Sequence, residues 1–185
     1  MRRVVVGGST SSGKSTFARD LAARLGAPVI ELDEIRHGPN WTETPEALFR
    51  ERLDPLTAAD TWVVDGNYSF ARDLTWDRAD TFVWLDYPLP LLLWRLIWRT
   101  NRRILRREVL WNGNRERFVN AYVSTNSLYL WVFRSYWKRR RNWPRLFAEP
   151  AYRHLAVHRF RAPGEAERWL RSVDGGDRDA PGPRS

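Results

Sequence analysis

The sequence contains no cysteine, which excludes disulfide bonds, zinc–thiolate sites and cysteine nucleophiles. It has only three histidines, so we do not expect a metal site built from several imidazoles. No apolar run approaches the roughly 18 residues that a membrane-spanning helix needs. The longest, residues 89–94, ends at Arg95, and Val4–Val6 is too short for the apolar part of a signal peptide. We therefore expect a cytoplasmic protein without a membrane span.

Lysine is scarce as well, with two lysines, Lys14 and Lys138, among the 31 basic residues of a chain whose formal net charge is +9. Residues 95–145 hold 14 basic and two acidic residues, a local charge of +12, so the rest of the chain sums to −3. A block this basic, with aromatic residues between its charges, favours a phosphate-bearing partner: a nucleotide, a nucleic acid or an anionic surface. The alternative is a solvated helical face without a partner, because most charge runs are exposed faces.

Short β-branched and apolar runs alternate with stretches of helical spacing. Strands are expected at residues 3–7, 28–33, 61–65, 81–86 and 155–160, and long helices over 89–110 and 126–143. This order predicts an α/β fold with a five-stranded, mainly parallel sheet flanked by helices. We expect one domain, residues 1–174, with a helical, arginine-rich insertion at about 95–145. Residues 175–185 lack large apolar side chains and are predicted to be a disordered tail.

One motif carries clear chemistry. Residues 8–15, GSTSSGKS, match G-x-x-x-x-G-K-[ST] at every fixed position, between an apolar strand and an amphipathic helix. Glycines let the backbone N–H groups wrap around phosphate oxygens, and the helix that follows directs its positive end at the same anion. Lys14 can reach the β- and γ-phosphates, and the Ser15 hydroxyl can bind Mg²⁺. The predicted ATP contacts are Gly8, Ser11, Ser12, Gly13, Lys14, Ser15 and Thr16.

The other residues decide among P-loop proteins. The guanine-reading N-K-x-D motif of GTPases is absent, and the chain is too short for a motor or helicase ATPase. A small kinase needs support for Mg²⁺, an acceptor site and mobile arginines. Asp65 ends the third expected strand, where a carboxylate could hold a water of the Mg²⁺ shell; the alternative is a turn formed with Gly66.

Asp33 ends the second expected strand, at the sheet edge where parallel sheets bind ligands. There it could accept a hydrogen bond or a proton from the acceptor hydroxyl, or equally cap a helix or turn. Arg72 is a candidate clamp for an anionic acceptor, with a plain surface arginine as the alternative. Trp41 could stack on a planar acceptor, although packing is the commoner role of a tryptophan. Trp94 and Trp98, one helical turn apart, are expected in the core.

The arginines after residue 95 form rows on a predicted helix. Arg99, Arg103 and Arg107 are spaced at i,i+4, and so are Arg102 and Arg106. Such rows repel one another without an anion, which predicts a lid that closes over the triphosphate and excludes water. Residues 111–116 contain an Asn-Gly turn signal between two helical stretches. We assign Arg103 and Arg106 to catalysis and Arg115 to acceptor binding.

Five segments resemble the adenylate-kinase-like proteins known as topology modulation proteins. They are the phosphate loop, LDEIRHGPNW (32–41), VVDGNY (63–68), WLDYP (84–88) and LWNGNRE (110–116). The resemblance covers about residues 2–172 and implies the nucleoside-monophosphate-kinase fold, with Asp65 near Mg²⁺ and Arg161 beside the adenine of ATP. Asn67-Tyr68 stand where adenylate kinases have Phe-Pro-Arg, so AMP is not implied as the acceptor, and Asn67 becomes a candidate acceptor contact.

The leading hypothesis is an ATP- and Mg²⁺-dependent phosphotransferase that acts on an unidentified, anionic small molecule. Lys14, Asp33, Arg103 and Arg106 would be catalytic, and Ser15 and Asp65 would hold Mg²⁺. The main alternative is a nucleic-acid-associated regulator that uses ATP as a switch and binds phosphates through residues 138–141. A weaker alternative places the basic helix of residues 89–107 on an anionic membrane.

Overall fold

The structure is a computed structural model that describes residues 1–39, 42–106 and 128–173. For residues 103–106 and 128–131 it describes the backbone alone. The predicted insertion is therefore seen as two helices. Trp41, Arg107, Arg115 and the predicted tail lie outside the described residues.

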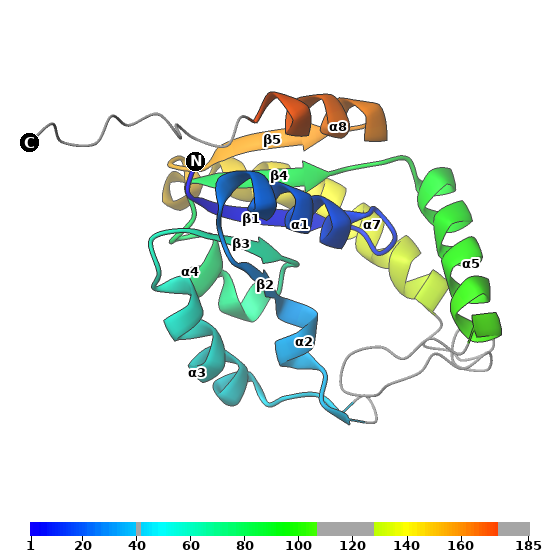
Figure 1. The fold of residues 1–185 in the computed structure, drawn as a ribbon, viewed down its shortest axis with the longest axis horizontal. Helices are drawn as coiled ribbons and strands as arrows, with labels where there is room; N and C mark the ends of the chain where they lie inside the picture. Colours follow the sequence, from blue (N-terminus) through cyan, green and yellow to red (C-terminus); the bar gives the residue numbers. More distant parts are fainter. Residues whose placement is uncertain (40–41, 107–127, 174–185) are drawn as a thin grey trace, which may run out of the picture.

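Five parallel strands form one sheet in the order β2-β3-β1-β4-β5, which confirms the predicted α/β class (Figure 1). The strands are β1 (Arg3–Gly8), β2 (Val29–Glu31), β3 (Trp62–Asp65), β4 (Thr81–Leu85) and β5 (Ala156–Phe160). The longer helices are α1 (Lys14–Leu25), α3 (Glu46–Thr57), α5 (Leu89–Arg106), α7 (Leu128–Ala148) and α8 (Pro163–Ser172). Short helices are α2 (Leu32–Arg36), η2 (Ser69–Ala71), α4 (Arg72–Thr75) and η4 (Pro150–Tyr152).

Helices cover both faces of the sheet, which explains why its central strands are apolar throughout. On one face, Val4 and Val6 of β1 pack with residues of α1 and α8, such as Leu21 and Leu170. On the other face, Val5 packs into a cluster with residues of α3, α4 and α7 that contains Trp143. This alternation along β1 is the period of two expected of a strand.

The strand register brings the predicted site residues to one edge. Val6 pairs with Asp65, and Glu31 pairs with the same Asp65 from the other side. The phosphate loop after β1, α2 after β2 and the turn after β3 therefore leave the sheet at the same carboxyl edge. Asp33 does not end a strand as predicted; β2 stops at Glu31, and Asp33 lies in the first turn of α2.

The prediction that Trp94 and Trp98 belong to the core is wrong, since their side chains are 64% and 58% exposed. The buried positions of α5 are Leu92, Leu96 and Thr100, which follow one another at i,i+4. Two residues further along a helix is about 200° away, so both tryptophans lie on the outer face. Within the described ranges, no helix combines the length and apolar character needed to cross a membrane.

Candidate active site

The phosphate loop has backbone geometry that few side chains tolerate. Gly13 has a φ of 86° and Ser11 a φ of 64°, both in the left-handed region. A Cβ at Gly8 would lie 2.6 Å from the Ser12 hydroxyl and 3.0 Å from the carbonyl oxygen of Leu85, so only glycine fits there. The Ser12 N–H donates to the Ser9 carbonyl at 3.1 Å and closes the loop. The sequence pattern is thus matched by a curled loop that leads directly into α1.

The start of α1 is suited to an anion. The helix begins at Lys14, has no acidic residue in its first turn and receives no side-chain cap, so its first N–H groups remain open. The hydroxyls of Ser11 and Ser12 are buried and have no hydrogen-bond partner among the described residues. Thr16 lies exposed in the same first turn. Unpaired donors around a positive helix end favour a phosphate ligand.

Asp65 is buried at the end of β3, with its Oδ1 atom unpartnered within the described part of the chain. Burial raises the pKa of its carboxyl above the ordinary value, while the Lys14 charge and a hydrogen bond with Ser15 act in the opposite direction. A carboxylate beside a hydroxyl is a donor set that Mg²⁺ accepts. The residues present therefore fit this ion. Among the described residues, no cluster of three or more His, Asp or Glu side chains could hold a metal ion.

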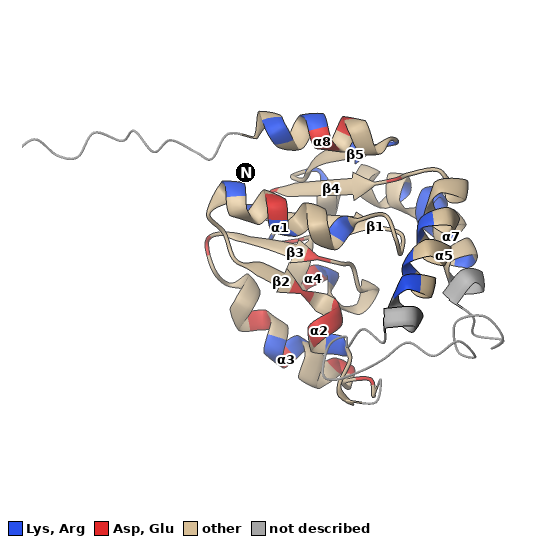
Figure 2. Cartoon of the chain, turned by 45° about the vertical axis from the view of Figure 1, so that its right-hand side comes forward, with Lys and Arg blue, Asp and Glu red and all other residues tan. Residues whose placement is uncertain are grey.

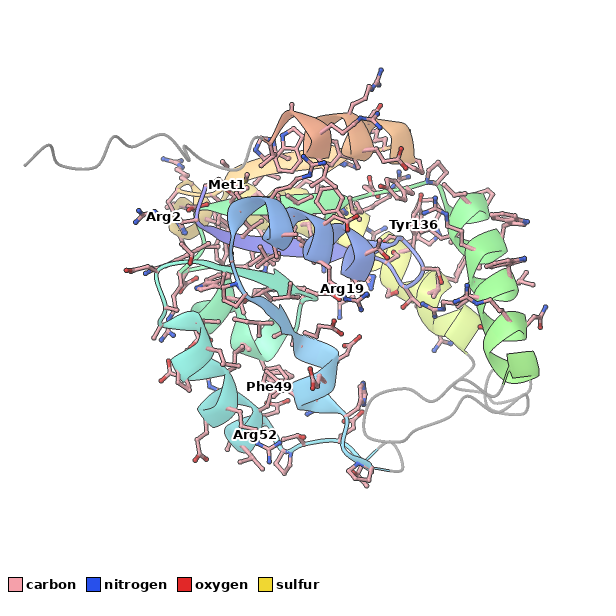
Figure 3. All side chains as sticks on the ribbon, in the orientation of Figure 1. Met1, Arg2, Arg19, Phe49, Arg52 and Tyr136 are labelled. Atoms are coloured by element: carbon pink, nitrogen blue, oxygen red, sulfur yellow. The ribbon has the colours of Figure 1, made fainter. Side chains whose placement is uncertain are left out.

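Asp33 is held by a tyrosine that sequence reasoning did not assign. The Tyr68 hydroxyl donates to Asp33 Oδ1 at 2.8 Å. Burial and the neighbouring charge of Asp33 raise the pKa of Tyr68, so the hydroxyl keeps its proton. The Tyr68 ring is packed against Phe49 and Phe70, and Figure 3 labels Phe49 between α3 and α2. Asp33 is thus fixed in orientation, and the N-cap position of α2 is Glu31.

Asn67 and Arg72 follow β3 but differ in their surroundings. Asn67 comes directly after Gly66, whose φ is 115°, and its Oδ1 is buried without a partner among the described residues. The Arg72 guanidinium lies 5.1 Å from the centre of the Trp76 ring, and its charge acts on Tyr152, which precedes β5. No described contact joins Arg72 to Asp33. Asn67, two residues after Asp65, is therefore the one of the two that directly follows the carboxyl edge of the sheet.

Two arginines reach the phosphate loop from the insertion. Arg95 of α5 donates to the Ser12 carbonyl at 3.4 Å, and Arg139 of α7 donates to the Ser9 hydroxyl at the same distance. Burial lowers the pKa of Arg139 to about 10, so it remains charged at neutral pH. Sequence reasoning placed this role on Arg103 and Arg106 of α5, whose side chains are outside the description. The signal that could have identified Arg139 is its position in the basic run of residues 138–141. Consecutive residues of a helix point in different directions, so a run of four cations cannot face solvent throughout.

Asp86 anchors α7 next to Arg139. Its buried carboxylate accepts from Arg140 Nε at 2.8 Å and from Arg159 Nη2 at 2.6 Å. Arg159 comes from β5 and stacks 4.1 Å from the centre of the Trp84 ring. The bridge ties α7 to the ends of β4 and β5, which directs the preceding Arg139 toward the loop. Arg161, which was predicted to lie beside the adenine, is exposed. Its backbone N–H donates to a carboxylate oxygen of Glu165 at 2.9 Å.

Comparisons with known proteins bear on the fold and on the enzyme class. No protein-family model matches the sequence. Two shikimate kinases, from Synechococcus elongatus and from another Synechococcus strain, are each 25% identical over 135 residues, which is 62% of this chain and 71% of the relative. A shikimate kinase from Acinetobacter baumannii, solved with shikimate, has a TM-score of 0.56 at 21% identity and covers 94% of this chain and 90% of its own. A gluconokinase from Sinorhizobium meliloti has a TM-score of 0.51 at 18% identity, covering 93% and 89%.

The solved structures confirm the predicted fold, and the sequence relatives support the predicted enzyme class, a P-loop kinase. They do not single out the topology modulation proteins. They also give no support to the nucleic-acid alternative, because none of the relatives described is named for binding nucleic acid.

Proposed function

We propose that this chain transfers the γ-phosphoryl group of ATP to a hydroxyl of a small, hydroxylated and anionic acceptor. The observation that carries the proposal is the shared edge of the sheet. It places a phosphate loop, a buried carboxylate with an open oxygen (Asp65) and a carboxylate fixed by a tyrosine (Asp33) after three neighbouring strands. Parallel α/β sheets bind ligands at this edge.

The loop N–H groups, Lys14 and the arginines bind and stabilise the phosphates. Arg95 and Arg139 approach the loop from two different helices. Their positive charges neutralise the negative charge that builds up on the transferring phosphoryl group. Arg103 and Arg106 join them as the predicted lid arginines, and Arg161 borders the adenine. Ser15 and Asp65 hold Mg²⁺, which when bound neutralises charge on the β- and γ-phosphates.

Asp33 accepts the proton or the hydrogen bond of the acceptor hydroxyl. Because Tyr68 donates to its Oδ1, the orientation of the Asp33 carboxylate and of its remaining lone pairs is set by a protein side chain rather than by solvent. Asn67, with its buried open oxygen, accepts from a second hydroxyl of the acceptor. Arg72 and the predicted contact Arg115 bind its anionic group, and the predicted contact Trp41 stacks on a planar part of the acceptor. Relatives named for shikimate and gluconate suggest hydroxylated acids as the first acceptors to test.

We also propose that the chain is related to the topology modulation proteins. The support is the set of matching segments around the site, above all VVDGNY, which supplies Asp65, Asn67 and Tyr68. We propose a cytoplasmic location because no apolar run of the sequence is long enough for a membrane span.

The proposal is tested by measuring ADP formed from Mg²⁺-ATP with a panel of hydroxylated acids, sugars, nucleosides and nucleoside monophosphates. One acceptor class should stimulate turnover, and Asp33→Asn should lower the stimulated rate on the order of a hundredfold. The matched control is Asp20→Asn, an exposed aspartate on α1. ATP binding without stimulation by any acceptor, or equal rates for the two variants, would contradict the proposal.

A further inference from the structure

Helix α5 exposes a group of large apolar side chains. Trp94 and Trp98 lie on the side of the helix opposite its buried face, and Ile97 is exposed beside them. Arg95 lies on an adjacent side, from which it donates to the phosphate loop. Trp94 and Trp98 are one turn apart and therefore adjacent on the surface, with Ile97 beside them. Arg102 stacks 5.3 Å from the centre of the Trp98 ring. We refer to Trp94, Ile97 and Trp98 as the α5 ridge.

An exposed ridge of this kind needs an explanation. Single exposed apolar residues are ordinary, but grouped large ones mark surfaces that bind a partner. The phosphate-loop site uses none of the three side chains. The rest of the described surface has its exposed large apolar residues mostly apart from one another, such as Leu48 and Leu56 on α3.

Helix α7 contacts α5, and Figure 2 shows Lys and Arg positions in blue along both helices. Arg134, Lys138, Arg141 and Arg145 are all exposed, and among the described side chains none of the four is in an ion pair. Phe133 and Trp137, one turn apart beside these cations, are each about half exposed. Neither helix contains a single carboxylate within its described bounds. We refer to the four cations as the α7 cations.

We propose that the outer faces of α5 and α7 bind the surface of a bilayer that contains anionic phospholipid. Tryptophan prefers the boundary between headgroups and acyl chains, and a ridge of two indoles with an isoleucine can enter this boundary. The α7 cations complement the negative headgroups, and the absence of carboxylates on both helices removes repulsion. Binding would hold the kinase at the membrane surface while its phosphate-loop edge remains a separate site.

Two other occupants fit less well. A second copy of the chain would bring two faces of the same positive charge together, which opposes a symmetric dimer. Single-stranded nucleic acid also stacks on aromatic rings beside cations. However, Ile97 offers no ring, and the ridge is better matched by a partner that removes aliphatic as well as aromatic area from water.

The experiment is co-sedimentation of the full chain with phosphatidylcholine vesicles, with and without phosphatidylglycerol. We expect binding to the anionic vesicles only, weakened by added salt. The double variant Trp94→Gln/Trp98→Gln should reduce the partition coefficient about tenfold. Exchanging the α7 cations for glutamine should reduce it by at least about tenfold.

Matched controls come from other helices. Leu48→Gln/Leu56→Gln removes exposed apolar residues from α3, and Arg168→Gln/Arg171→Gln removes exposed cations from α8. Both should leave vesicle binding within about twofold. Circular dichroism and thermal unfolding establish that each variant is folded.

Three results with vesicles and oligonucleotides would overturn the proposal, and a fourth concerns self-association. They are no binding to anionic vesicles, equal losses in the control variants, and a preference for a single-stranded oligonucleotide over vesicles at the same salt. A concentration-dependent dimer abolished by Trp94→Gln/Trp98→Gln, without vesicle binding, would overturn it in favour of a second copy. Because these readouts do not involve ATP, they are independent of whether the chain proves to be a kinase.

Discussion

The molecule uses positive charge differently at the phosphate loop and on the surface of α7. The two lysines show this difference, and so do the arginines of α7, of which one faces the loop and others face solvent. At the phosphate loop, Lys14 is placed by the backbone itself, through a curled loop that admits only glycine at Gly8. On α7, adjacent residues of one basic run have opposite roles, since Arg139 turns inward to Ser9 while Lys138 faces solvent. Position relative to the sheet edge, and not charge, therefore decides which cation serves the site.

The comparison is tested most strongly by replacing each of the two lysines in turn with alanine. Lys14→Ala should lower turnover with ATP by about a hundredfold to a thousandfold, because it removes a fixed cation from the transferring phosphoryl group. Lys138→Ala, at an exposed position on α7, should leave the rate within about twofold. Steady-state ADP release from both variants measures this. Similar losses in both would mean that the surface of α7 belongs to the reaction.

The anchor of α7 is tested by Asp86→Asn. The substitution leaves Arg140 and Arg159 without their buried carboxylate, and removing one partner of such a bridge costs about 3 kcal/mol of stability. The unfolding temperature should fall by roughly 5–10 °C. Asp73→Asn is the matched control, since it breaks the exposed pair with Arg50 and should change the unfolding temperature little. An unchanged unfolding temperature in Asp86→Asn would show that α7 is held by its apolar face alone.

The inward and outward arginines of α7 can be separated by paired lysine substitutions. Arg139→Lys keeps a charge but loses the planar donor group beside Ser9, so kcat should fall roughly tenfold to a hundredfold. Arg141 is two residues further along and exposed on the opposite side of α7, so Arg141→Lys should keep the wild-type kcat and KM. Full activity in Arg139→Lys would remove this residue from the phosphate site.

The smallest expected effect concerns Asp65 and pH. Because the folded protein raises its pKa, the folded state of the ligand-free chain binds the proton more tightly than the unfolded state. Stability conferred by this group is therefore present at low pH and is lost as pH rises through the raised pKa. Asp65→Asn should raise the neutral-pH unfolding temperature of the ligand-free protein by about 2–4 °C.

The same Asp65→Asn protein should lose the extra thermal stabilisation that Mg²⁺ adds to ATP. Differential scanning calorimetry with ATP, with and without Mg²⁺, measures both effects. Lower stability of the ligand-free variant at neutral pH would contradict the assignment of an open, desolvated carboxylate.

The fold and the phosphate loop were predictable because their causes are local. The central strands β1, β3 and β4 are short, mainly apolar runs, and the motif of residues 8–15 dictates its own backbone through the positions of two glycines. Asp65 followed from the same logic, as the last residue of a buried strand.

The features that could not be predicted from the sequence depend on how each helix is rotated about its own axis relative to the sheet. The spacing of Trp94 and Trp98 suits a buried face as well as an exposed one, and only the packing of Leu92 and Leu96 decides between them. Arg139 likewise reaches Ser9 because its neighbour Arg140 is held by Asp86, 54 positions away in the chain. The bond between Tyr68 and Asp33 joins residues that are 35 positions apart.

The central claim is that this sheet edge transfers phosphoryl groups, and ³¹P NMR of a reaction mixture tests it directly. With the wild-type chain, Mg²⁺-ATP and an acceptor that stimulates ADP release, a new phosphomonoester resonance should grow as the γ-phosphate resonance of ATP declines. It should be absent with Lys14→Ala or when Mg²⁺ is chelated. Inorganic phosphate as the sole product, or ATP that binds and stays intact with every acceptor, would contradict the account.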